Sequence, residues 1–475
     1  MKIKFNDFRR GINRKNSDNL IALSEAKNCC NFDFSGGSLK TSFPFEPCFE
    51  GFLTSEVISE EFTEEGKRLA GGAIFYFKKF DFDEGKDASK LVLVTPKLNT
   101  FYLPLGESDA NFVPLGIRFS SLPSAINYRL DSEDVIIFSS PTDNMVVWNG
   151  ESEPEIIIDA PKITSMCLHN ERLFATTDDG LNTVWFSDDL DPTNWSVSLV
   201  DAGFIQLADE RGAPKKVISF NGYVYIFREK GISRLSASGG QEEFYLSHLF
   251  VSSGKIYDKT ICLCGDKIIF LASDGLYSFN GTDTTKILID IRDLFLQVPK
   301  TTACFFDGKY YLTVHADFDG GQAEAKKERA NALFVLDTTT SEYLLHGGIG
   351  VSSMAISEQG EAHTLYFLND FIEGSEPLIS FFNKDKKDSP YSKYITGLYD
   401  FGDPQKKKTV RKITTYKIGG GGLSVKIFNE TGCSVKVEPK SDFSSMPVLF
   451  SGKALGFEIC ASGEIELENL VLEVY

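Results

Sequence analysis

The sequence lacks any long apolar run and is short of basic residues. Its longest apolar stretches, such as Ala332 to Leu336, are far too short to span a bilayer. Residues 1–15 are charged and contain no apolar signal segment, so we expect a soluble protein that is made in a cytoplasm and not inserted in a membrane. The 49 Lys and Arg residues face 67 Asp and Glu residues, which gives a formal net charge of −18. This charge favours solubility and opposes a role that wraps nucleic acid, because the surface repels phosphates.

The usual motifs of catalytic, cofactor and metal sites are also missing. The five histidines show no pairing of the His-x-x-x-His type, and neither a Gly-x-Ser-x-Gly elbow nor a phosphate-binding Gly-Lys-Ser loop occurs. The nine cysteines form no Cys-x-x-Cys pair and no zinc spacing, so we interpret them as reduced, buried thiols. The sequence therefore indicates no cofactor and no metal site.

Three acidic turns place oxygen atoms at alternate positions, as calcium ligands are placed. They are residues 81–85, 189–191 and 317–320. None continues into a complete EF-hand loop, so we interpret them as solvated hairpin tips, and calcium binding stays an open alternative. A pair of catalytic carboxylates also stays open, because the chain has 67 acidic residues.

What the sequence does contain is a repeated strand–turn pattern. Long periodic helices are missing, and the 40 Phe residues, with frequent Val, Ile, Tyr and Thr, suit half-buried strands. Five short aromatic or β-branched strands open successive units at intervals of roughly 38, 51, 44 and 42 residues, the spacing of a four-stranded propeller blade. These strands are 134–138, 172–175, 223–227, 267–270 and 309–312. The turns carry Asn-Gly and Asp-Gly pairs, which supply the positive φ of tight hairpins.

The predicted fold is all-β: a β-propeller of six or seven blades, with six preferred, an N-terminal leader and a C-terminal β-sandwich. The leader, residues 1–66, is expected to contain a short helix at 24–30 and a hairpin at 31–40, and to close the propeller or dock on it. The propeller is predicted at residues 67–393.

The sandwich is predicted at residues 394–475, where the pattern changes. Alternating strands at 410–418 and 423–427 flank a run of glycines that turns the chain. The same alternation returns near the C-terminus, which is typical of a small two-sheet module.

One stretch nearly forms the Ser-x-Asp-x-Gly-x-x-Trp turn of sialidase-type propellers. Its key residues are Ser187, Asp189, Asp191 and Trp195. The pattern is imperfect, because Asp191 stands where Gly is expected and Trp195 comes one residue late. We predict a structural turn rather than a sugar-processing site, in which a carboxylate satisfies backbone donors and the Trp packs between strands.

The one basic cluster consists of Lys406, Lys407, Lys408, Arg411 and Lys412. We interpret it as the solvated beginning of a strand. Docking of an acidic partner is the alternative.

Three stretches share a pattern with a known family. The first is Phe8-Arg9-Arg10-Gly11-Ile12-Asn13, followed by Glu25-Ala26, Asn31 and Gly37-Ser38-Leu39-Lys40-Thr41. The second comprises 172–174, 184–188 and 191–195, and the third comprises 205–207, 214–220, 223–227 and 231–232. Together they resemble the β-propeller tail proteins of tailed bacteriophages, which are called tail nozzle, tail tubular protein B or packaged-DNA stabilisation protein.

The resemblance implies a virion structural protein with no catalytic activity. In that family a closed hexameric ring lies below the portal and adaptor, and DNA leaves the capsid through it. The implied partners are copies of the chain itself, the adaptor or connector, other tail proteins, and double-stranded DNA that passes without specific binding. The implied location is the virion tail, assembled in the host bacterial cytoplasm. The acidic composition agrees, because a negatively charged channel lets DNA slide.

Two other functions stay open at this point. A carbohydrate-binding or glycan-processing propeller that reads a host receptor predicts a central pocket lined by Trp, Tyr and paired carboxylates. A host scaffold propeller predicts surfaces that bind other proteins.

Overall fold

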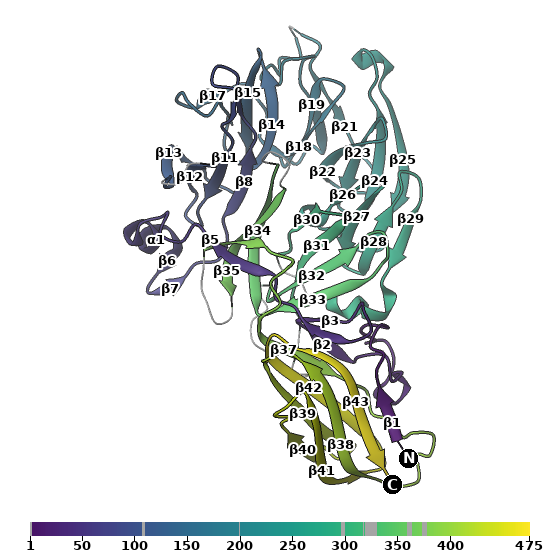
Figure 1. Cartoon of the computed structure of the whole chain (residues 1–475). Helices are drawn as coiled ribbons and strands as arrows, with labels where there is room; N and C mark the ends of the chain where they lie inside the picture. The colour runs from purple at the N-terminus through teal and green to yellow at the C-terminus, as the bar shows by residue number, and fades with distance from the viewer. Residues whose placement is uncertain are drawn as a thin grey trace.

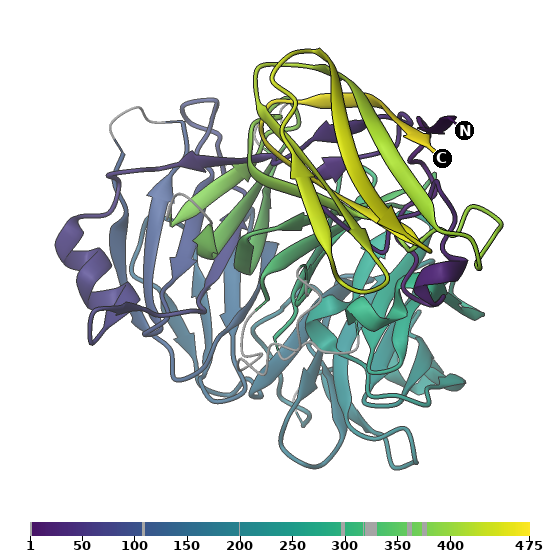
Figure 2. The same ribbon diagram turned by 90° about the horizontal axis from the view of Figure 1, so that it is seen from below.

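The computed structural model describes residues 2–106, 110–198, 200–295, 300–316, 318, 330–358, 363–372 and 378–475. A ring of small sheets lies above an elongated two-sheet module, and both chain termini lie at the far end of that module (Figure 1). The view from below shows the sheets arranged around a centre, with the two-sheet module in front of them (Figure 2).

Within the described residues, seven four-stranded antiparallel sheets make a seven-bladed β-propeller. Blade 1 consists of β8 (Ala73–Phe77), β11 (Lys90–Val94), β12 (Asn99–Pro104) and β13 (Val113–Arg118). Blade 2 consists of β14 (Ser124–Leu130), β15 (Glu133–Ser139), β16 (Met145–Trp148) and β17 (Glu155–Ile157). Blade 3 consists of β18 (Ile163–His169), β19 (Arg172–Thr177), β20 (Thr183–Phe186) and β21 (Gly203–Gln206). Blade 4 consists of β22 (Pro214–Phe220), β23 (Tyr223–Arg228), β24 (Gly231–Ser236) and β25 (Tyr245–Val251). Blade 5 consists of β26 (Cys262–Cys264), β27 (Lys267–Ala272), β28 (Gly275–Phe279) and β29 (Thr284–Ile287). Blade 6 consists of β30 (Ala303–Phe306), β31 (Lys309–Val314), β32 (Ala332–Asp337) and β33 (Tyr343–Gly347).

Blade 7 is finished by a strand from the other end of the chain. It consists of β34 (Ile349–Ser357), β35 (Thr364–Ile372), β36 (Ile379–Phe382) and β5 (Phe45–Cys48). Phe382 pairs with Phe45, and Ile379 with Cys48. The propeller therefore has seven blades rather than the preferred six, because the last blade borrows its outer strand from the leader.

Apolar cores between neighbouring blades close the ring. The first strands of blades 7 and 1, β34 and β8, contact each other at the hub. Leu91, Leu368 and Ile379 form part of the core between these two blades, and Phe77 and Trp148 form part of the next. Each blade buries both faces in this way, which explains why its strands are rich in aromatic and β-branched residues.

The leader contributes strands to both the propeller and the sandwich. β1 (Lys2–Phe5) and β4 (Leu39–Thr41) pair with β43 (Glu466–Val474) of the sandwich, and β2 (Asn28–Cys30) pairs with β37 (Ser389–Ile395). The predicted hairpin is confirmed, because β3 (Phe32–Asp33) pairs with β4. The predicted helix at 24–30 is wrong: Asn28 to Cys30 form a buried strand, since pairing with a distant strand outweighs a weak local helix preference.

A six-stranded sheet and a five-stranded sheet make the sandwich. One sheet runs β3-β4-β43-β38-β41, with β1 also on β43, and the other runs β2-β37-β42-β39-β40. The C-terminal strands are β37 (Ser389–Ile395), β38 (Lys408–Ile418), β39 (Gly422–Asn429), β40 (Ser434–Val437), β41 (Phe443–Gly452), β42 (Leu455–Gly463) and β43 (Glu466–Val474). The predicted boundary between residues 393 and 394 falls inside β37.

The remaining elements are short. α1 (Ser55–Phe62) begins after Thr54, whose side chain accepts a hydrogen bond from the Val57 amide at 3.3 Å. The others are η1 (Asp18–Leu20), β6 (Thr63–Glu64), β7 (Lys67–Arg68), β9 (Phe80–Asp81), β10 (Lys86–Asp87), η2 (Gln241–Glu243), η3 (Asp258–Thr260) and η4 (Ile289–Phe295).

Candidate functional sites: the joint and the hub groove

Residues of the leader pattern fasten the sandwich to the propeller. Gly11 has a φ of +71°, and a Cβ atom at this position would lie 2.7 Å from the hydroxyl oxygen of Tyr343 in β33. The Ile12 amide donates to this oxygen at 2.7 Å, and the Tyr343 hydroxyl donates back to the Ile12 carbonyl at 3.1 Å. Glycine suits both the left-handed backbone and the close approach. Gly11 therefore lets the leader dock on blade 6.

The Asn31 side chain ties three segments together. Its Nδ2 donates to the Gly347 carbonyl in β33 at 3.2 Å and to the Tyr391 carbonyl in β37 at 2.6 Å. Its Oδ1 accepts from the Gly347 amide at 2.9 Å. Only 2% of Asn31 is exposed, so one buried amide links the leader, blade 6 and the sandwich.

A continuous apolar core lies beneath these hydrogen bonds. Phe8 is buried and packs edge-on against Tyr394 of β37, with ring centroids 5.3 Å apart. The same core includes Leu312 of blade 6 and Leu472 of the sandwich. The two modules therefore cannot part without exposing apolar surface to water. We call the region around Phe8, Gly11, Asn31, Tyr343 and Tyr394 the joint.

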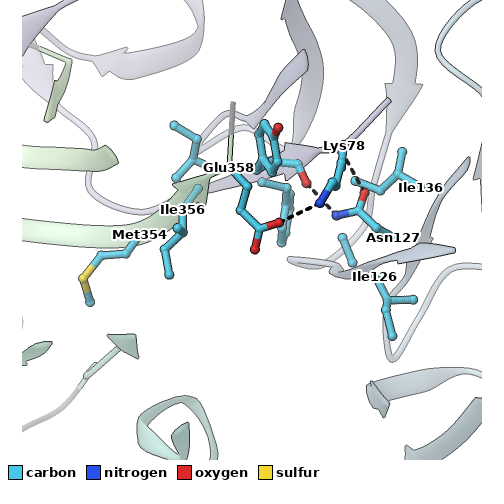
Figure 3. Close-up of a pocket in the computed structure, with 12 residues that line it drawn as sticks. Lys78, Ile126, Asn127, Ile136, Met354, Ile356 and Glu358 are labelled. Atoms are coloured by element: carbon cyan, nitrogen blue, oxygen red, sulfur yellow. Dashed lines mark hydrogen bonds and ion pairs between the residues drawn. The ribbon is translucent and has the colours of Figure 1, made fainter. Parts of the chain in front are cut away.

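A groove opens at the hub between the inner strands of blades 7, 1 and 2 (Figure 3). Ile126, Met354 and Ile356 form much of its apolar wall. Its volume is about 370 Å³, and it continues into a second space of about 570 Å³. The two spaces share the residues Tyr76, Lys78, Asn127 and Glu358. We call them together the hub groove.

The polar side chains of the hub groove bridge three blades. Lys78 Nζ lies 2.9 Å from Glu358 Oε2, and this carboxylate raises the pKa of Lys78. Asn127 covers the free edge of β8: its Nδ2 donates to the Tyr76 carbonyl at 2.9 Å, and its Oδ1 accepts from the Lys78 amide at 3.3 Å. Figure 3 shows these contacts converging on the Lys78 side of the groove. Burial raises the pKa of Tyr76, so its hydroxyl stays protonated.

This arrangement suits binding of a small polar ligand. Four described carboxylates line the hub groove: Asp87, Asp134, Glu171 and Glu358. Asp134 already accepts from the Phe80 amide at 3.0 Å, and Asp87 accepts from the Ser89 amide at 2.8 Å. No Trp is among the described lining residues. No sequence signal marks this groove, because its residues come from four blades, one of which lies at the other end of the propeller sequence.

In the predicted turn after β20, side-chain oxygens accept hydrogen bonds from backbone amides. Ser187 Oγ accepts from the Leu173 amide at 3.0 Å. Asp191 Oδ1 accepts from the Thr193 amide at 2.9 Å. These contacts hold the loop in place.

The other two residues of the turn behave differently from each other. Trp195 is buried in the core between blades 2 and 3, and its Nε1 donates to the Pro192 carbonyl at 3.0 Å. Asp189 is exposed, and its Oδ1 lies 4.0 Å from the Arg172 Nε. Trp195 therefore has the packing role, while Asp189 is on the surface.

The five residues of the predicted basic cluster differ in how far they are exposed. Lys408 is buried, and its Nζ donates to the carbonyls of Asp403 and Lys453, so it holds a loop and is not part of the solvated surface. Lys406 and Lys407 are exposed.

Arg411 and Lys412 lie one after the other on β38. Arg411 is exposed, and its guanidinium carbon lies 4.6 Å from the centre of the Tyr475 ring. Lys412 is half-buried and stands opposite Glu473 in the pairing of β38 with β43.

In the acidic turns that the structure describes, carboxylates accept hydrogen bonds from backbone amides. Asp81 Oδ1 accepts from the amides of Asp83 and Glu84 at 2.9 and 3.0 Å, and these bonds lower the pKa of Asp81. The turn at 317–320 lies outside the described residues except for Phe318. Among the residues that are described, no group of three or more His, Cys, Asp or Glu could hold a metal ion. The nine cysteines are free, but only Cys29, Cys30 and Cys264 are buried as predicted; five others are partly buried and Cys433 is exposed.

Comparison with known proteins leaves function unassigned. Among the described residues, no helix has the length and apolar character needed to cross a membrane. No protein-family model matches the sequence, and no curated protein matches it.

Several solved structures are similar in shape at very low sequence identity. BamB from Moraxella catarrhalis is 10% identical, with a TM-score of 0.39, and the match covers 75% of this chain and 96% of that chain. BBS1N in complex with ARL6DN, soaked with mercury, is 9% identical, with a TM-score of 0.44 over 72% of this chain and 98% of that chain. The lead-soaked form of the same complex is 10% identical, with a TM-score of 0.44 over 72% and 99%. With TM-scores below 0.5, these matches carry no argument, and the propeller rests on the strand pairing described above.

Proposed function

We propose that the protein is a structural subunit of a bacteriophage tail. In this proposal six copies form a nozzle or hub ring below the portal and adaptor, which retains the packaged DNA and then conducts it during ejection. The chain has no catalytic activity in this role and is part of the virion, assembled in the host bacterial cytoplasm. Its partners are its own copies, the adaptor or connector, other tail proteins, and the passing DNA.

The joint is the observation that carries the proposal. Phe8, Gly11 and Asn31 belong to the leader pattern that resembles the phage tail proteins, and all three lie where the propeller meets the sandwich. They make the two modules one body, whereas domains within a chain ordinarily move relative to one another. Such stiffness suits a subunit whose role is mechanical.

The charge of the chain also supports the proposal. A net charge of −18 gives an assembled ring a repulsive surface toward phosphates. DNA that passes such a surface is not held by counterion release, so it moves freely.

The hub groove favours a second candidate, a propeller that binds or processes carbohydrate. Its aliphatic wall, its Lys78–Glu358 pair and its tyrosines are groups that suit a polar ligand. It lacks the Trp expected of a sugar platform among its described residues, which is why we rank this candidate second.

Electron microscopy and a glycan array separate the two candidates. We expect negatively stained, purified protein to form closed rings with sixfold symmetry and the array to show no binding. Particles that stay single at all concentrations, together with glycan binding that Glu358→Gln abolishes, would support the carbohydrate reader instead.

A further inference from the structure

The molecule exposes two surfaces of opposite charge, each with large apolar side chains. The first, at the end of the sandwich, comprises Lys406, Lys407, Arg411, Leu449 and Tyr475, and we call it the basic tip. The second, on the outer strand of blade 2, comprises Glu153, Glu155, Ile156, Ile158 and Asp159, and we call it the acidic edge. Figure 1 shows β17 at the top of the molecule and the chain termini, beside the basic tip, at the bottom.

The basic tip presents apolar side chains that the fold itself does not use. Leu449 is 83% exposed and Tyr475 is 64% exposed. Leu449 lies in a bulge, because Val410 pairs with Phe450 while Lys412 pairs with Pro447. A bulge of this kind aims a side chain away from the regular sheet face.

Basic side chains lie near these apolar side chains. Lys406 and Lys407 are exposed, and Arg411 lies over the Tyr475 ring. Lys2 and Lys4 of the adjacent β1 are exposed too, although Lys2 Nζ pairs with Glu473 at 3.4 Å. The tip is thus a basic, partly apolar surface on a protein whose net charge is −18.

The acidic edge has the complementary composition. Ile156 is 60% exposed and Ile158 is 75% exposed. The segment from Glu151 to Lys162 contains four carboxylates and one lysine. Glu151 pairs with Lys79 at 2.6 Å, whereas Glu153, Glu155 and Asp159 make no ion pair with the described part of the chain.

β17 is also an edge strand, because it is the last strand in the sheet order of blade 2. Proteins commonly protect such edges with Lys residues, and none lies between Glu151 and Asp159. Exposed isoleucines at an unpaired edge are typical of a surface that another chain covers.

We propose that the basic tip of one copy docks on the acidic edge of the next. A single molecule cannot bring the two surfaces together, because they lie at its opposite ends. The contact is therefore heterologous, and such a contact forms a ring when its rotation closes. The isoleucines, Leu449 and Tyr475 supply apolar area, and the opposed charges set the register. This inference rests on the proposed function and names the surfaces that build the ring.

Charge reversal in the full-length chain tests the inference. The tip variant carries Lys406→Glu, Lys407→Glu and Arg411→Glu, and the edge variant carries Glu153→Lys, Glu155→Lys and Asp159→Lys. Analytical ultracentrifugation should show that each variant alone assembles at least about tenfold more weakly than the natural chain, because like charges then face each other. An equimolar mixture should assemble again, since each reversed surface finds its complement on the other variant.

Two further variants separate this effect from general changes in charge or folding. Lys97→Glu, Lys230→Glu and Lys255→Glu reverse three exposed lysines elsewhere and should leave assembly unchanged. Leu449→Ser removes an apolar side chain that the folded subunit does not bury, and it should weaken assembly without lowering thermal stability.

The outcomes distinguish the inference from the proposed function. If the natural chain forms rings and the tip variant forms them equally well, the interface lies elsewhere and the inference is wrong, while the ring stands. If both variants dissociate but their mixture does not assemble, the tip binds some surface other than the acidic edge, and the inference is wrong again. If the natural chain never assembles, the proposed function itself fails.

Discussion

At the residue scale, Gly11 makes the sharpest prediction. Gly11→Ala should lower the free energy of unfolding by about 1–3 kcal/mol, because a Cβ would meet the Tyr343 hydroxyl at 2.7 Å on a backbone with a φ of +71°. Chemical denaturation measures the change. Gly36→Ala is the matched control in the same leader, since a Cβ there meets nothing within 4 Å. Equal stability of the two variants would contradict the role assigned to Gly11.

His346 should make stability depend on pH. It is buried in β33, and burial lowers its pKa from 6.5 to about 4, although its bond to the Ser42 carbonyl at 3.2 Å partly offsets this. The unfolded chain therefore binds the proton more readily between these pH values, so the stabilising contribution is complete above about pH 6.5 and is lost as the pH falls toward 4. It amounts to roughly 3 kcal/mol, since one pKa unit corresponds to about 1.4 kcal/mol.

The measurement for His346 is the difference between two denaturation series over pH 4–7. His346→Gln should show a shallower loss of stability on acidification than the natural chain. His363→Gln, which changes an exposed histidine, should follow the natural chain. A His346→Gln series parallel to that of the natural chain would count against the buried neutral imidazole.

The sequence pointed to residues of the joint but not to what they do. The leader pattern included Gly11 and Asn31, and both have structural roles: Gly11 through its backbone and Asn31 through the hydrogen bonds of its side-chain amide. Their partners, Tyr343 and Tyr391, lie more than 300 positions further along the chain, so no local pattern predicts the contact. The basic cluster was interpreted as solvated, and Lys406, Lys407 and Arg411 are exposed. Lys408 is the exception, because it turns inward to the carbonyls of Asp403 and Lys453.

At the element scale, β5 completes the ring. Phe45 of β5 is buried and contacts the rings of Phe43, Phe367 and His346, with centroids 5.0, 5.3 and 5.6 Å away. Phe45→Ala should cost about 3–5 kcal/mol, which is typical of a large buried aromatic side chain. Hydrogen exchange should rise in β36, which pairs with β5, and in the neighbouring β35, and it should stay unchanged in β15 on blade 2.

Phe80→Ala is the control for β5, because Phe80 is 45% exposed and should change neither stability nor exchange in β36. Exchange that rises uniformly over all blades after Phe45→Ala would mean that β5 has no local role in closing blade 7.

Strand positions could be predicted from the sequence, whereas strand partners could not. The regular spacing of aromatic and β-branched strands correctly indicated a propeller, because buried strands demand those residue types. The predicted helix at 24–30 was wrong because Cys29 and Cys30 pair with Tyr394 and Lys393 of β37. Of the six or seven blades that were predicted, seven is correct. The preference for six was wrong, because the last blade pairs strand 379–382 with strand 45–48, which lies far away in sequence.

At the scale of the whole molecule, the joint should make unfolding cooperative. Because one apolar core includes Phe8, Leu312 and Leu472, we expect calorimetry to show a single transition for the full chain. Two separated transitions, with the sandwich melting first, would show that the joint does not couple the modules. The hub groove belongs to this scale as well, and it could not be predicted from the sequence because only folding brings its residues together.

The most direct test of the account is the molar mass of the purified protein in solution. Light scattering at physiological salt should give about six times the 52.8 kDa of one chain, with closed rings in parallel micrographs. A mass of 52.8 kDa at every concentration tested would contradict the proposal that this propeller is a ring-forming tail protein.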